Sequence, residues 1–175
     1  FARAIREVGL AAGEPPARGG YTPSVFSTLP RLLERSGNSD IGSITAFYTI
    51  LVAGDDMNEP VADEVRSILD GHIILSADLA RQYHYPAVDV LSSASRVLTS
   101  ITTKDHQQLI GKIREVLATY KKNELLIKIG EYKRGSDKNV DFAIDYVDKV
   151  NRFLRQSIDE RSTWAETQQQ LKALF

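Results

Sequence analysis

The sequence predicts an α/β fold whose second half is purely helical, and three observations carry that prediction. The segment 42–53, G-S-I-T-A-F-Y-T-I-L-V-A, is rich in the β-branched and aromatic residues that strands prefer and is nearly free of polar residues at its end. Short apolar segments then alternate with helix-like stretches up to about residue 100, which favours a parallel sheet. After residue 101 only amphipathic helical patterns follow.

In the first half, helices are expected where apolar residues recur at helical spacing after a capping residue or a proline. The predicted helices are 1–12, 24–35, a helix that starts at Pro60, and one from Ser76 to Gln82. Strands are predicted over 42–53, 72–75 and 87–91, where apolar runs are short and bounded by turn residues. Pro86 biases Tyr85 toward an extended conformation.

The second half predicts a small helical bundle. Thr103 is expected to cap a long helix, and Glu166 follows Thr163 at the spacing of a capping box. The expected helices after the long one are 124–132, 139–156 and 164–175.

Composition limits the possible classes of protein. A chain of 175 residues holds one domain, or one domain and a small second one. The net charge of −1 gives no overall attraction to nucleic acid or membrane. The absence of cysteine excludes disulfides and thiolate metal sites and fits a cytosolic protein. No run of about 18 apolar residues predicts a membrane span. Because the sequence opens at Phe1 inside a helical pattern, we expect it to be cut from a longer chain.

Two groups of residues are candidates for chemistry. Arg96 follows a serine-rich turn at the predicted end of a strand, where a fixed cation is suited to phosphate, although the same pattern fits an ordinary surface arginine. The loop 54–60 carries Asp55, Asp56 and Glu59, which fits a metal or acid–base site or a solvated, partner-facing loop. No histidine or further acid is spaced to complete a cage, so no metal site is predicted.

The segment 112–138 is locally basic, which fits either a nucleic-acid surface or a face for an acidic protein partner. The acids Glu115, Glu124 and Glu131 interrupt it, and no RNA-binding aromatic motif is present. We therefore favour a solvated or protein-binding face and predict no nucleic-acid partner.

Several segments, in order along the chain, resemble the type III secretion ATPases. This family drives the flagellar export gate and the virulence injectisome and is related to the catalytic subunits of rotary ATP synthases. The segments that carry the resemblance are 9–35, 42–49, G-D-D-M-N-E-P-V-A-D at 54–63, 68–76, and H-Y-P-A-V-D-V-L-S-S-A-S-R-V at 84–97. The resemblance implies the second half of a RecA-like P-loop NTPase core over 1–100 and a small all-α C-terminal domain over 101–175.

The resemblance also implies roles for particular residues. Arg96 matches the family's arginine finger, which reaches the γ-phosphate held by the neighbouring subunit, and Tyr85 matches the aromatic residue that stacks on adenine. Trp164 stands where the ATP synthase relatives have another adenine-side aromatic residue, although it fits a bundle-core residue equally well. Ile158 replaces a third aromatic residue, so the implied pocket is less aromatic. The loops containing Gly20 and Tyr21, and Asp55, Asp56 and Glu59, match those that line the ring's pore and contact its stalk.

The family's phosphate loop, catalytic glutamate and magnesium-linked aspartate would precede Phe1. ATP and Mg²⁺ are therefore expected for the complete enzyme only, and this segment alone is expected not to hydrolyse ATP. The implied partners are five further copies in a homohexamer, a central stalk, a stator or regulator protein, and chaperone–substrate complexes. The implied location is cytoplasmic, peripheral at the inner-membrane export gate. The injectisome is favoured over the flagellum because segment 62–72 resembles that branch; a docking module or a rotary ATPase subunit remain alternatives.

Overall fold

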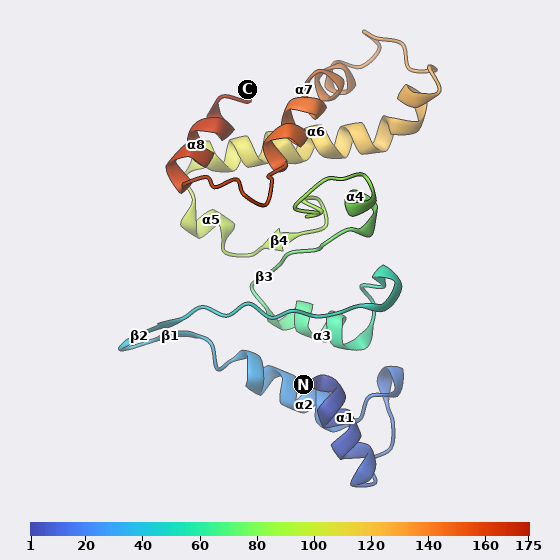
Figure 1. Ribbon diagram of the computed structural model, residues 1–175, viewed down its shortest axis with the longest axis vertical. Coiled ribbons are helices and arrows are strands. Elements are labelled where there is room, and N and C mark those ends of the chain that lie inside the picture. Colours follow the sequence, from blue (N-terminus) through green and yellow to red (C-terminus); the bar gives the residue numbers. More distant parts are fainter. The chain divides into compact units, whose positions relative to one another are not determined.

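The computed structural model describes all residues from Phe1 to Phe175, and the chain divides into two compact units. The first unit is Phe1–Asp70 and the second is Gly71–Phe175. Figure 1 follows the chain through them from blue to red. Each unit has its own cluster of buried apolar side chains.

The first unit is built on three helices, α1 (Ala2–Ala11), α2 (Pro23–Leu33) and α3 (Pro60–Ile68), with single 3₁₀ turns at Arg18–Gly20 and Ala53–Asp55. The three predicted helices are thereby confirmed. α3 begins at Pro60, and the Glu59 carboxylate caps it by accepting a hydrogen bond from the Ala62 N–H at 3.3 Å.

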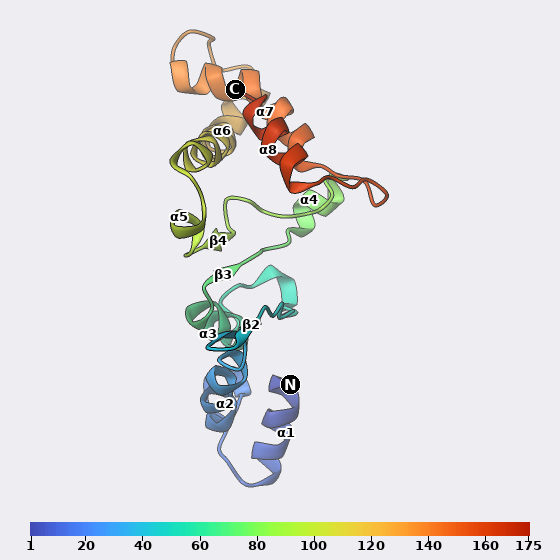
Figure 2. The ribbon, with the colours of Figure 1, turned by 90° about the vertical axis from the view of Figure 1, so that its left-hand side faces the viewer.

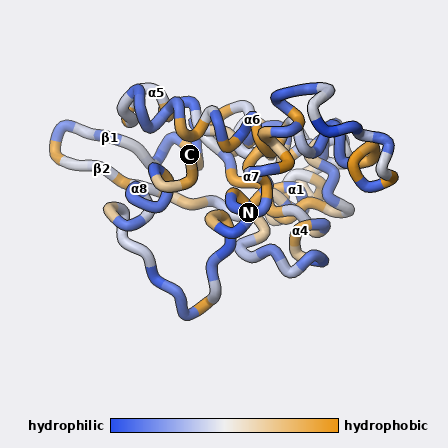
Figure 3. Tube along the Cα trace, turned by 90° about the horizontal axis from the view of Figure 1, so that it is seen from above, coloured by the Kyte–Doolittle hydropathy of each residue, from blue (hydrophilic) through white to orange (hydrophobic).

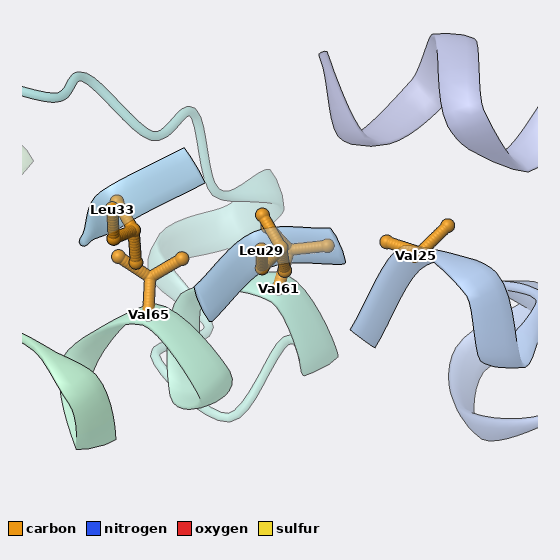
Figure 4. Packing of buried hydrophobic residues seen from close by; sticks show 5 residues of the cluster. All are labelled: Val25, Leu29, Leu33, Val61 and Val65. Carbon is orange, nitrogen blue, oxygen red and sulfur yellow. The ribbon is translucent and has the colours of Figure 1, made fainter. Parts of the chain in front are cut away.

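The core of the first unit lies between α2 and α3. Val25, Leu29 and Leu33 recur every four residues and so occupy one face of α2. Figure 4 shows this row beside Val61 and Val65 of α3.

α1 runs beside α2 (Figure 2), and a glycine allows the close approach. Gly9 is buried, and a Cβ atom built on it would lie 2.5 Å from Oγ1 of the fully buried Thr22. A side chain at position 9 would therefore collide with the start of α2.

The strand predicted over 42–53 is wrong beyond Ile44. Only Gly42–Ile44 (β2) pairs, in an exposed antiparallel hairpin with β1 (Gly37–Ser39). The rest of the segment has no assigned secondary structure before Ala53, and Phe47 and Leu51 are exposed. β-rich composition shows that side chains suit a sheet, but a strand forms only where another chain segment accepts its hydrogen bonds.

The second unit begins with short elements: β3 (Gly71–His72), α4 (Ala77–Arg81), β4 (Ala94–Ser95) and α5 (Leu98–Ile101). β3 pairs with β4 in antiparallel register, Gly71 opposite Ser95. Both two-stranded sheets are antiparallel, so the expected parallel sheet is not formed by this chain.

The strands predicted over 72–75 and 87–91 are mostly absent as well. β3 ends at His72, and one isolated bridge joins Leu75 to Val88. Asp89 explains the second absence, because its carboxylate accepts hydrogen bonds from the Leu91 and Ser92 N–H groups and so bends the chain into a turn.

The remainder of the second unit is helical: α6 (Lys104–Lys128), α7 (Lys138–Leu154) and α8 (Trp164–Lys172). Thr103 caps α6, and Thr163 with Glu166 forms the predicted capping box of α8. A separate helix over 124–132 is wrong, because α6 continues unbroken to Lys128. No glycine or proline interrupts it there, and Glu124 pairs with Lys128 across one turn at 2.7 Å.

Apolar and polar residues alternate along these helices (Figure 3). The buried cluster of this part consists of Ile113, Val116, Val147, Val150 and Leu171. No helix of the chain has both the length and the apolar character that crossing a bilayer requires.

Candidate functional site

Tyr83 and Tyr85, just after the end of α4, lie next to each other. The chain leaves this helix through a turn in which the Tyr83 N–H donates to Ala80 O at 3.0 Å and the His84 N–H to Leu79 O at 2.9 Å. This hydrogen-bond pair is the Schellman motif, and it puts Tyr83 in the left-handed conformation with φ +57°. Glycine is the usual residue there, so a tyrosine in this conformation is strained.

Tyr83 and Tyr85 line a surface cavity that is wide open to solvent, with a volume of about 480 Å³, in the second unit. Their rings meet edge to face, 6.2 Å apart. The loop after α7 supplies the other side, and its Gln156 N–H donates to Tyr85 O at 2.8 Å. The lining residues are Tyr83, Tyr85, Arg152, Arg155, Gln156, Ser157 and Glu160. Two aromatic rings beside two guanidinium groups suit a planar ligand that carries negative charge.

His84 lies between these tyrosines in sequence but is itself 5% exposed. Burial first, and then the positive charge of Arg155, lower the pKa of His84 below its usual 6.5. At neutral pH the imidazole is therefore uncharged.

The other two residues implied for the adenine side are not among those that line the cavity. The Ile158 side chain is 99% exposed. Trp164 is 70% exposed, and its ring lies 5.7 Å from that of His106, whose Nδ1 is 2.7 Å from Gln168 Oε1. The roles given to Tyr85, Ile158 and Trp164 stay predictions.

Arg96 is exposed and directly follows β4. The turn before β4 is tightly held. The Asp89 carboxylate accepts from the Leu91 N–H at 2.9 Å, the Ser92 N–H at 3.1 Å and the Ser92 hydroxyl at 2.8 Å. Burial alone would raise the pKa of Asp89, but these hydrogen bonds and the charge of Lys121 outweigh burial and lower it. The carboxylate is thus kept ionised as the organiser of the turn.

The two loops predicted to face a pore lie side by side in the first unit. Arg18 Nη2 is 2.6 Å from Asp63 Oδ2, and a Cβ on Gly19 would lie 2.5 Å from Pro60 Cγ. Tyr21 is half-buried; burial first, then its hydrogen bond with Glu59 and the charge of that carboxylate, raise the pKa of Tyr21. Gly20 is half-buried beside it.

The acidic residues of the second loop differ in their surroundings. Asp55 and Asp56 are exposed, whereas Glu59 caps α3. Asp63 accepts hydrogen bonds from Arg18 and Arg66, which lower its pKa. No group of three or more His, Asp or Glu side chains in the chain lies close enough to hold a metal ion.

Two protein-family models match the chain. Residues 1–95 match the nucleotide-binding domain of the ATP synthase alpha/beta family, and residues 102–173 match the C-terminal domain of the type III secretion ATPase EscN. The sequence is 60% identical over 160 residues to the SPI-2 type 3 secretion system ATPase of Salmonella typhimurium, covering 91% of this chain. It is 57% identical over 166 residues to the flagellum-specific ATP synthase of Bacillus subtilis, covering 95% of this chain. The chain spans 37% and 38% of the length of these two relatives.

Solved structures agree with the sequence matches. The assembled ATPase EscN of the enteropathogenic E. coli type III secretion system superposes with a TM-score of 0.96 at 49% identity, over 99% of this chain and 42% of that one. EscN in complex with its central stalk EscO gives a TM-score of 0.89 at 48% identity, over 99% of this chain and 41% of that one.

Fold and sequence together define a nucleotide-binding domain of the ATP synthase alpha/beta family followed by a helical domain. The predicted class, the second half of a RecA-like core with an all-α domain after it, is confirmed. Within that class the chain belongs to the type III secretion and flagellar export ATPases, of which it represents the C-terminal part.

Four residues of this region are not indicated by any motif in the sequence. Arg152 and Arg155 lie one turn apart at the end of a predicted helix, so their spacing could have paired them. Tyr83 precedes Tyr85 by two residues, but nothing in the sequence indicates its left-handed conformation. Arg114, on α6, donates hydrogen bonds to the turn before Arg96.

Proposed function

We propose that this chain is the C-terminal part of an ATP hydrolase that powers type III protein secretion, by releasing chaperones from export substrates and unfolding the substrates. Residues 1–100 would complete its RecA-like domain, and residues 101–175 would form the helical domain. Membership of the secretion ATPase family supports this proposal. ATP and Mg²⁺ would be bound by the complete enzyme.

Arg96 is proposed as the arginine finger, the group that reaches the γ-phosphate on a neighbouring subunit. The observation that carries this role is its position: the side chain is exposed, and it directly follows a strand and a firmly held turn. A guanidinium presented this way keeps a permanent charge and can stabilise the charge of the transition state.

Tyr85 is proposed to stack on the adenine base, with Ile158 and Trp164 on the same side of the nucleotide. Its place on the wall of the 480 Å³ cavity supports this role. The adjoining Arg152 and Arg155 would then meet the polar part of the ligand.

The assembly is proposed to be a homohexamer with a central stalk, and EscN supports it because that relative has been described both assembled and in complex with its stalk EscO. Gly20, Tyr21, Asp55, Asp56 and Glu59 would face the pore or the stalk. A stator or regulator protein and chaperone–substrate complexes are further proposed partners, and nucleic acid is not. The proposed location is cytoplasmic, peripheral at the inner-membrane export apparatus.

The test is Arg96→Ala in the complete enzyme. Steady-state ATP turnover should fall by about 10³–10⁵, the usual contribution of such a finger. Binding of a fluorescent ATP analogue should stay within about twofold, because the finger acts on the transition state. Arg96→Lys, which keeps the charge without the planar fork, is the matched control and should recover little. Equal loss of binding and turnover in Arg96→Ala would refute the role.

An injectisome is favoured over a flagellum, and this proposal draws on the 60% identity to the Salmonella type 3 secretion system ATPase. The flagellar alternative has its own support in the 57% identity to the Bacillus protein. Complementation separates the two: the complete gene should restore effector secretion to a strain that lacks its injectisome ATPase and leave a flagellar-ATPase deletion non-motile. Restored motility alone would favour the flagellar function. A docking module or a rotary ATPase subunit would restore neither.

A further inference from the structure

The guanidinium of Arg114 binds three backbone carbonyls of the turn that precedes Arg96. Arg114 is half-buried on α6. Its Nη1 donates to Val90 O at 2.6 Å and more weakly to Ser93 O at 3.4 Å, and its Nη2 donates to Leu91 O at 2.9 Å. One side chain from the helical part therefore holds a segment that lies more than twenty residues earlier in the chain.

The remaining carbonyl of the same turn also meets a side chain. The carbonyl of Ser92 lies 3.1 Å from Nε2 of His72, in β3. The Ser93 hydroxyl donates to Asp89 O at 2.7 Å and accepts from the Ile74 N–H at 2.9 Å. All four carbonyls of residues 90–93 are thus within hydrogen-bonding distance of side-chain nitrogens, and three of them depend on Arg114.

An arginine is suited to this task for a geometric reason. Its planar fork carries five N–H donors, so one group can serve several carbonyls that a turn leaves without helix or sheet partners. A lysine ammonium is a single point charge with no fixed fork, and it could not reproduce the same set of contacts.

We propose that Arg114 is a positioning residue that fixes the turn 89–93 and, through it, the place from which Arg96 extends. This inference rests on the proposed role of Arg96. β4 follows the turn directly, and Arg96 follows β4, so only two residues separate Ser93 from the finger. Placement errors near 1 Å can cost about 100-fold in rate, so a loosened turn reduces the effect of the finger even though Arg96 is intact.

The first experiment compares variants of the complete enzyme. Arg114→Met keeps the length of the side chain but removes its donors, and kcat should fall about 10- to 100-fold while KM for ATP stays within twofold. Arg114→Lys should lie between Arg114→Met and the parent. Lys122→Ala, which removes an exposed cation two turns further along α6, is the control and should behave as the parent. Hydrogen exchange of the amides of residues 90–95 should become faster in Arg114→Met and remain unchanged in Lys122→Ala.

A folded Arg114→Met enzyme with parental kcat would overturn the proposal. A rise in KM at unchanged kcat would overturn it as well, because the residue would then serve ground-state binding instead of the finger.

Mixed rings give a second test that does not depend on the stability of one variant. One subunit carries Arg96→Ala, and the other keeps Arg96 but has its nucleotide site inactivated. Mixing them should restore turnover at interfaces where an intact nucleotide site meets an intact finger. Adding Arg114→Met to the subunit that supplies Arg96 should lower the restored turnover about 10-fold or more, whereas adding it to the Arg96→Ala subunit should change nothing.

The opposite pattern, or an equal loss from both placements, would refute the positioning role. A mixture that recovers no turnover would refute the finger in trans, and the positioning role would fall with it. The turnover recovered by the mixture without Arg114→Met thus separates failure of the proposed function from failure of this inference.

Discussion

Tyr83 gives the sharpest test of how the cavity is built, because its backbone is strained. The residue has φ +57° at the position after α4 where glycine is favoured. This conformation costs an L-residue about 1–2 kcal/mol, and glycine avoids the cost. The ring is 85% exposed, so its removal loses little buried area, mainly the edge contact with Tyr85.

The perturbation is a matched pair, Tyr83→Gly and Tyr83→Ala. Both remove the ring, but alanine keeps the Cβ atom that causes the strain. Glycine loses about 0.5–1 kcal/mol more backbone entropy on folding, so Tyr83→Gly should exceed Tyr83→Ala in unfolding free energy by about 0.5–1 kcal/mol. At a denaturant slope of about 2 kcal/mol per molar urea, the two midpoints should differ by roughly 0.25–0.5 M.

Urea titration followed by tryptophan fluorescence measures this difference. Trp164 is the single tryptophan, and it lies in the same compact unit as Tyr83. If the strained backbone serves to place the Tyr83 ring against the nucleotide, both variants of the complete enzyme lose that contact. Each should then bind a fluorescent ATP analogue about fivefold or more weakly, by the same factor. An alanine variant as stable as the glycine variant would refute the strain. Unequal losses of binding would refute the role of the ring.

Two further predictions concern the second unit. Val116→Ala removes buried methyl groups from the apolar cluster and should cost about 2–3 kcal/mol of unfolding free energy. Leu125→Ala, at an exposed position of the same helix, should cost under about 0.5 kcal/mol. Equal urea midpoints for the two variants would contradict this. Burial and the charge of Arg155 lower the pKa of His84 below 6.5, so the unfolded chain binds a proton more readily than the folded one. The stability that is fully present above pH 6.5 is therefore lost as the pH falls through the folded-state pKa. His84→Gln should flatten that loss in unfolding measured from pH 7.5 to 4.5, and an unchanged pH profile would exclude His84 as its source.

The helices were predictable because their determinants are local. Thr103 and the Thr163–Glu166 box lie within one turn of the helix starts that they stabilise, and the apolar stripes repeat within each helix. The unbroken length of α6 was not predictable because the polar residues Lys121–Glu124 interrupt the apolar pattern after Tyr120, as the start of a new helix would.

The strands were not predictable, because pairing is a relation between distant segments. The apolar residues of 45–52 favour a sheet, yet no other segment of this chain pairs with them. At 87–91 the pairing stays short. One bridge joins Val88 to Leu75, and the Asp89 carboxylate then binds the N–H groups just after it and turns the chain.

Some residues of the candidate site could likewise be predicted from the sequence, and others could not. Tyr85 and Arg96 could be named as candidates from the sequence because their side chains fall within residue patterns shared with a family; their roles stay predictions. Arg114 was not found, because its partners are backbone carbonyls, and every residue has one. The side chains at Val90, Leu91 and Ser93 therefore carry no trace of the contact, and replacing Leu91 by another residue would leave its carbonyl in place. Only a substitution of Arg114 itself removes these hydrogen bonds. No pair of side chains in the sequence therefore indicates Arg114, although its loss is expected to displace the whole turn.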